Sequence, residues 1–143
     1  MKFKKTIILS LTLAILVTAF IPVSAKEPIA ENAYSDYISP RYSYIINASL
    51  SVTPSSSQTN YKITVSAISK ITSISGTLTL YKQNSSGKYE EKESQSVSCS
   101  GSRLNTTGSF SSYGSGNYRL TFDGKVAGSG ISEPITISAE NSY

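Results

Sequence analysis

The chain has 143 residues, of which 13 are Lys or Arg, 9 are Asp or Glu and none is His. Without histidine, the commonest general base and the commonest zinc ligand are both missing, which argues against Cys-His proteases and His-based zinc sites. Cys99 is the only cysteine, so an intramolecular disulfide is excluded and the fold has to be stabilised by packing alone.

The first 25 residues have the pattern of a secretory signal peptide. Three lysines precede an apolar run from Ile7 to Ile21, and Val23 and Ala25 place small residues at the expected cleavage site. An uncleaved membrane anchor is the alternative, which the shortness of the apolar run disfavours. We therefore expect a secreted protein, extracellular or loosely associated with the cell wall. With neither a second apolar segment nor a Leu-Pro-x-Thr-Gly sorting signal, we expect no stable membrane anchor after cleavage and no covalent wall anchor.

Removing the signal peptide changes the balance of charge. Three of the 13 basic residues and none of the 9 acidic residues lie in residues 1–25. The mature chain therefore has ten basic and nine acidic side chains. Nucleic-acid binding draws on many clustered Lys and Arg, whereas these are scattered, so we expect no nucleic-acid partner. The length that remains suits a flexible lead over residues 26–38 and a single domain over residues 39–143.

Hydroxyl residues make up about a third of the mature chain and alternate with apolar residues at the period of a β-strand. The inward face of the first predicted strand is Tyr44, Ile46, Ala48, Leu50 and Val52. After a turn-rich stretch over residues 53–60, the second has Tyr61, Ile63, Val65 and Ala67.

The middle of the chain predicts a hairpin. A strand with Ile74, Gly76, Leu78 and Leu80 on one face leads into a Gly-bearing loop over residues 84–88. The returning arm is charged on both faces as far as Glu93, which suits an exposed edge strand. Further along this arm we expect Cys99 to be half-buried.

Three more strands complete the pattern. Their predicted inward faces are Leu104, Thr106 and Phe110, then Tyr118, Leu120 and Phe122, and finally Ile131, Glu133, Ile135, Ile137 and Ala139. Between the last two we expect a turn at Asp123-Gly124, and Pro134 indicates a bulge or an edge position.

Seven or eight short strands in about 100 residues predict an all-β fold, an antiparallel sandwich of about seven strands, with a closed barrel as the alternative. The run Gly-Asn-Tyr-Arg-Leu-Thr-Phe over residues 116–122 resembles the penultimate strand of immunoglobulin-like sandwiches. In that strand the Tyr follows a turn and packs at a corner. The Trp and the cysteine pair of antibody domains are absent, so the resemblance is to the broader disulfide-free immunoglobulin-like architecture.

A second resemblance covers about residues 39–139. The run Ser-Pro-Arg-Tyr-Ser-Tyr-Ile over residues 39–45 follows a signal peptide and precedes Ser/Thr-rich strands, a Leu-Tyr-Lys hairpin and a Gly-x-Tyr strand. In these features the chain resembles uncharacterised small secreted proteins of Firmicutes. That resemblance implies an exported β module and no particular activity, cofactor or site residue.

No catalytic constellation stands out. The acidic residues that would have to supply paired carboxylates for glycoside cleavage are Glu90, Glu91, Glu93, Asp123 and Glu133. The first three form one charged run with Lys92, which a solvated edge strand explains better. A Ser-Lys pair is the other alternative, and we favour solvated strand lysines. Phosphate-binding Gly loops and calcium loops are also missing from the sequence, so we expect no cofactor, no metal and no enzymatic activity.

The strongest candidate for binding is a loop rich in Tyr, Ser, Gly and Asn, the composition that binding loops use. Its candidate residues are Ser112, Tyr113, Ser115 and Asn117. The alternative is a plain Gly turn followed by a core Tyr118. A second candidate is an aromatic surface for stacking on sugar rings, formed by Tyr34, Tyr37 and Tyr42.

We therefore predict a non-enzymatic module that binds an envelope or extracellular protein or polysaccharide through loops. A structural or self-associating surface protein without a specific ligand is the alternative.

Overall fold

The computed structural model describes residues 42–143, which lie in one compact unit. The expected signal peptide, the lead over residues 26–38, Tyr34 and Tyr37 lie outside the described residues. Residues 42–143 form strands and no helix, and accordingly contain no helix long and apolar enough to span a membrane. The strands are β1 (Ile45–Pro54), β2 (Gln58–Ala67), β3 (Ile71–Gln83), β4 (Tyr89–Ser100), β5 (Arg103–Ser111), β6 (Asn117–Gly128) and β7 (Ile131–Ser142).

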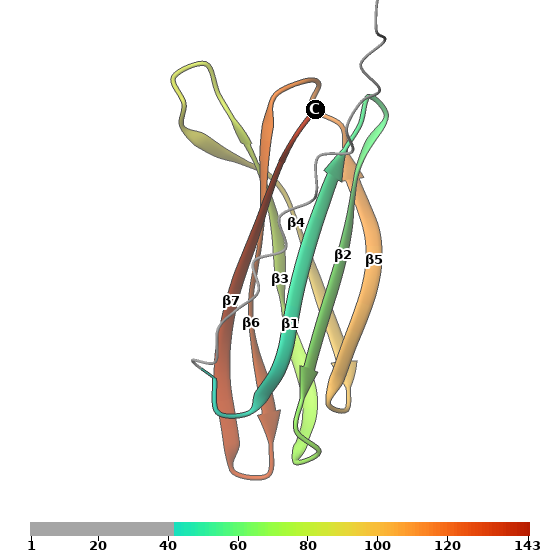
Figure 1. The fold of residues 1–143 in the computed structure, drawn as a ribbon, viewed down its shortest axis with the longest axis vertical. Helices are drawn as coiled ribbons and strands as arrows, with labels where there is room; N and C mark the ends of the chain where they lie inside the picture. Colours follow the sequence, from blue (N-terminus) through green and yellow to red (C-terminus); the bar gives the residue numbers. More distant parts are fainter. Residues whose placement is uncertain (1–41) are drawn as a thin grey trace, which may run out of the picture. The chain divides into compact units, whose positions relative to one another are not determined.

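The seven strands form two antiparallel sheets that pack face to face (Figure 1). One sheet has the order β1-β2-β5 and the other has the order β4-β3-β6-β7. The fourth strand thus joins the second sheet rather than pairing with β5. The predicted all-β antiparallel sandwich of seven strands is thereby confirmed.

The core lies between the sheets and follows the predicted alternation. Every strand contributes side chains to one buried cluster, as a period of two requires when one face of each strand is covered. The fully buried larger side chains include Val52, Ile63, Val65, Ile71, Ile74, Leu78, Leu80, Leu104, Tyr118, Leu120, Phe122 and Ile135. Cys99 is half-buried on β4, as expected.

The predicted orientation of Ile46 is wrong. Its side chain is 70% exposed, while Ala48, which has the same parity, is buried. The register of β1 against β2 shifts between Ile45 and Asn47, and this bulge breaks the alternation ahead of the regular part of the strand.

The turn between β1 and β2 is shorter than the predicted turn over residues 53–60, because β1 continues to Pro54 and β2 begins at Gln58.

The predicted turn at Asp123-Gly124 is also wrong, because both residues lie inside β6. Gly124 pairs with Gly76 of β3, and both glycines lie against the ring of Phe122. A Cβ on Gly124 would come within 2.5 Å of the Ser75 carbonyl oxygen and 2.6 Å of the Phe122 ring. The glycine therefore serves close packing within a strand. Pro134 lies on β7, an edge strand, which was one of the two positions predicted for it.

Candidate functional site

The β1–β2 turn over residues 55–57, the β3–β4 tip over residues 84–88 and the β5–β6 loop over residues 112–116 lie at one end of the sandwich, together with the end of β7 (Figure 1). We call this set the loop end. The β3–β4 hairpin extends from it as an arm. The backbone of Gly116 exchanges two hydrogen bonds with Tyr143, at 2.7 and 3.0 Å, so the β5–β6 loop is attached to the end of β7.

The buried side chain of Tyr118 is hydrogen-bonded to the backbone of the β5–β6 loop. Its side chain has no exposed surface, and its hydroxyl donates to the Gly114 carbonyl and accepts the Tyr113 N–H at 3.2 Å. Gly114 and Gly116 have φ values of 77° and 135°, which glycine adopts at little cost. This is the arrangement known as a tyrosine corner, near the start of the sixth strand. The expected Gly turn with a core tyrosine is therefore present.

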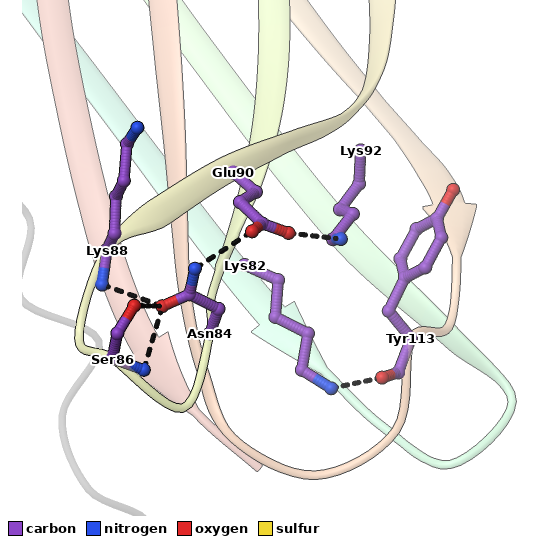
Figure 2. Close-up of polar contacts among 7 residues, drawn as sticks. All are labelled: Lys82, Asn84, Ser86, Lys88, Glu90, Lys92 and Tyr113. Atoms are coloured by element: carbon purple, nitrogen blue, oxygen red, sulfur yellow. Dashed lines mark hydrogen bonds and ion pairs between the residues drawn. The ribbon is translucent and has the colours of Figure 1, made fainter.

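Tyr113 is half-buried and tied to the β3–β4 arm. Its hydroxyl donates to Glu93 at 2.7 Å. Its carbonyl accepts a hydrogen bond from Lys82 Nζ, as Figure 2 shows. Hydrogen bonds from Ser111 and then from Tyr113 lower the pKa of Glu93. The same bond to Glu93, with burial second, raises the pKa of Tyr113. Tyr113 therefore stays neutral and fixed beside a charged carboxylate.

The other candidate loop residues differ in how firmly they are held. The Ser112 hydroxyl donates to the Ser55 carbonyl at 2.7 Å, which joins the β5–β6 loop to the β1–β2 turn. The Asn117 amide donates to Gln83 on β3 at 2.8 Å. Ser115 is exposed, and its side chain makes no hydrogen bond to another residue within 42–143. Ser112, Tyr113 and Ser115 thus lie in the β5–β6 loop, and Asn117 directly follows it as the first residue of β6. Hydrogen bonds to three other segments fix the frame of this loop.

The tip of the arm is organised by Asn84. Its side-chain oxygen accepts hydrogen bonds from the Ser86 amide, the Ser86 hydroxyl and the Lys88 amide, at 2.7 to 3.0 Å (Figure 2). Its amide group donates to Glu90, which also forms an ion pair with Lys92 at 3.2 Å. Bonds of this kind are the reason that Asn favours turns. The arm therefore ends in an ordered turn.

An aromatic and charged cluster on the second sheet, beside the arm, was not predicted. The Arg119 guanidinium lies 3.9 Å from the centre of the Tyr89 ring and forms a 2.6 Å ion pair with Glu140. Tyr81, which is half-buried, is the cross-strand partner of Arg119 on β3. These residues come from four strands, so only the register places them together.

Tyr42, the described member of the predicted aromatic surface, lies away from this loop. It is half-buried against the core, and its hydroxyl lies 3.5 Å from the Thr136 carbonyl oxygen on β7. A shallow groove of about 490 Å³ also lies away from the loop end, on the outer face of the second sheet. It is lined by Ser75, Gly76, Asp123, Gly124, Lys125, Ser132 and Pro134.

The carboxylates considered for catalysis are dispersed over the fold. Glu133 accepts the Ser43 and Tyr44 amides at 2.7 and 3.0 Å, and Asp123 accepts the Thr136 hydroxyl at 2.7 Å. Glu90 accepts a hydrogen bond from Asn84 within the arm. Glu93 accepts hydrogen bonds from the Ser111 amide on β5 and from the Tyr113 hydroxyl in the β5–β6 loop. Within residues 42–143, no group of three Cys, Asp or Glu side chains is placed to hold a metal ion.

Comparison of the chain with protein-family models, with curated proteins and with solved structures gives no match.

Proposed function

We propose that the protein is an exported, non-enzymatic module that binds a polymer of the cell envelope or the extracellular space at its loop end. The observation that carries the proposal is the bonded frame of Tyr113, in which Tyr118, Lys82 and Glu93 fix its backbone and its hydroxyl. A loop that is ordered before binding loses little conformational entropy when it binds. Tyr, Ser and Asn then supply amphipathic contact area and hydrogen bonds.

A hydroxyl-rich glycan suits this surface better than an apolar protein patch. Among the described residues, the exposed large hydrophobic side chains are Ile46 and Tyr143, at 70% and 50% exposure, and only Tyr143 belongs to the loop end. Protein interfaces are centred on desolvated apolar or aromatic anchors, which are scarce on this surface. The half-buried Tyr113 combines an apolar ring with a polar hydroxyl beside amide and hydroxyl groups, which suits contact with a sugar ring.

A binding role also fits the way the acidic side chains are used. Each of Glu90, Glu93, Asp123 and Glu133 holds a backbone or side-chain donor of a neighbouring segment. A general acid and base would instead face a shared space at a distance set by the reaction. These contacts support structural roles for the carboxylates.

The test is sedimentation of the purified protein with insoluble cell-wall glycan. Protein is produced from the 143-residue sequence in unchanged form and as Tyr113→Ala and Asn117→Ala, with Ser129→Ala at the opposite end as the matched control. We expect Tyr113→Ala to abolish binding and Asn117→Ala to weaken it about tenfold, the loss of roughly one good polar contact. Ser129→Ala should bind as the unchanged protein does.

Thermal unfolding of each variant establishes that it is folded before its binding is compared. If Tyr113→Ala unfolds, the exposed Asn117 remains the test of the site. Retained binding in both loop variants, or capture of an envelope protein in place of glycan, would contradict the proposal.

A further inference from the structure

Three of the four edge strands carry features that block pairing with another chain. In β4, the register shifts between Leu80 and Tyr81 of its partner strand, and its first half is densely charged. β7 contains the exposed Pro134. β1 has a bulge at Ile45–Asn47 and is joined to β7 by side chains, because Asn141 donates to the Val52 carbonyl at 3.0 Å.

β5 is the exception among the described strands. It pairs with β2 without a register shift, contains no proline and has one charged residue, Arg103, at its start. Among residues 42–143, no strand pairs with its other edge. An unguarded edge of this kind offers a row of backbone donors and acceptors to an added strand.

The open part of this edge can be located from two contacts at its ends. The Arg103 carbonyl accepts from the Cys99 thiol at 3.2 Å, and the Ser111 N–H donates to Glu93 at 3.1 Å, so both groups point away from β2 toward β4. In an antiparallel strand, alternate residues direct their N–H and C=O groups to the same edge. The same edge therefore presents the backbone groups of Asn105, Thr107 and Ser109.

The side chains of these three residues leave that edge clear. All three are exposed on the outer face of the sheet. The Asn105 side-chain oxygen accepts from the Thr64 hydroxyl on β2 at 3.3 Å, so this side chain leans away from the open edge. An added strand would lie where the fourth strand of an immunoglobulin constant-type sheet lies, because here that strand has moved to the other sheet.

We propose that a second copy of this chain pairs with β5 along this edge, antiparallel and with the two-fold axis at Thr107. In this register Thr107 lies opposite Thr107 of the second copy, and Asn105 lies opposite Ser109. Each of these residues then exchanges both backbone hydrogen bonds with its opposite residue. Arg103 lies opposite Ser111, so no like charges meet, and the small hydroxyl and amide side chains cross without a clash. The proposal does not depend on ligand binding at the loop end.

The first experiment measures molar mass by sedimentation equilibrium. It uses protein from the 143-residue sequence at concentrations up to about 1 mM, the range in which a short edge contact associates. We expect a monomer–dimer equilibrium. Thr107→Pro removes the central N–H, which β2 does not use, and should weaken association at least about tenfold.

A charge exchange covers the case in which Thr107→Pro fails to fold. Thr107→Lys and Thr107→Glu should each be monomeric alone, because like charges then meet at the axis, and should form a mixed dimer when combined. Thr53→Lys, an exposed residue of β1 in the same sheet, is the matched control and should associate as the unchanged protein does.

Amide exchange identifies the edge itself. The N–H groups of Asn105, Thr107 and Ser109 should become protected as concentration rises. Three outcomes would overturn the proposal: a monomer at every concentration, a dimer that Thr107→Pro and the charge variants leave intact, or protection of these amides in the monomer. The last result would mean that another segment of the same chain covers the edge.

Discussion

The two halves of the β3–β6 strand pair are held in different ways. In the middle of the sheet, Gly76 lies opposite Gly124, and the Phe122 ring fills the space that their side chains would take. At the loop end, Lys82 lies opposite Tyr118, and hydrogen bonds to the β5–β6 loop hold the structure. The glycine half depends on volume, whereas the loop half depends on polar bonds that substitutions can remove one at a time.

The largest expected effect is that of Gly124→Val, in the glycine half. The new side chain would collide with the Ser75 carbonyl and the Phe122 ring, and backbone does not yield as a flexible side chain does. We expect the free energy of unfolding to fall by about 3 kcal/mol, the upper range for overpacking. Chemical denaturation measures it.

The control for this variant is Thr121→Val on the same strand. The Thr121 hydroxyl is buried and has no hydrogen-bond partner among the described residues, so replacing it with a methyl group of the same shape should not lower stability and should raise it slightly. Equal losses in the two variants would show that the glycine pair is not a special constraint.

In the loop half, Tyr118→Phe should cost about 2 kcal/mol, because the Tyr113 N–H and the Gly114 carbonyl lose a buried partner. Amide exchange at Tyr113 should accelerate more than exchange in the core. Tyr81→Phe is the control, since Tyr81 is a half-buried tyrosine on the outer face of β3. A stability loss without any change at Tyr113 would contradict the view that Tyr118 holds the loop.

The sequence was sufficient to predict the sandwich and most of its core. One face of each strand is buried, and the alternation records that directly, as in Ile63 and Val65 or Leu120 and Phe122. It was insufficient at Ile46 and Gly124. The bulge at Ile46 depends on the register of β1 with β2. The need for glycine at position 124 depends on the Phe122 ring, which lies against Gly76 of β3 as well as Gly124 of β6.

The candidate site shows the same division. Tyr113 and Asn117 are only four residues apart in sequence, so local composition alone indicated that they belong to one site. Their partners Lys82, Glu93 and Gln83 belong to a hairpin about 20 to 34 residues earlier, and no local pattern links them to the loop. Only the pairing of β3 with β6 brings the two segments together.

A smaller effect is expected at the tip of the arm. Asn84→Ala removes the acceptor for the Ser86 and Lys88 amides, which then turn to water because the tip is exposed. We expect a loss of about 1 kcal/mol, with faster amide exchange confined to residues 84–88. Ser85→Ala, a neighbouring substitution in the same turn, is the control. Faster exchange in the core as well would show that the arm and the sandwich unfold together.

The smallest effect is the pH dependence contributed by Glu93, which connects the arm to the loop. Its pKa in the folded protein is lowered from 4.5 by hydrogen bonds from Ser111 and Tyr113, so the bonded carboxylate stabilises the fold above that value. This stability should be lost as the pH falls below 4.5 and through the lowered pKa. Glu93→Gln carries no such charge, so the difference in unfolding free energy between it and the unchanged protein should shrink from about pH 7 to about pH 3. Glu91→Gln, on the exposed part of the arm, is the matched control. A difference that stays constant over this range would mean that Glu93 acts on the loop by packing and not by its charge, and the loop half would then depend on volume as the glycine half does.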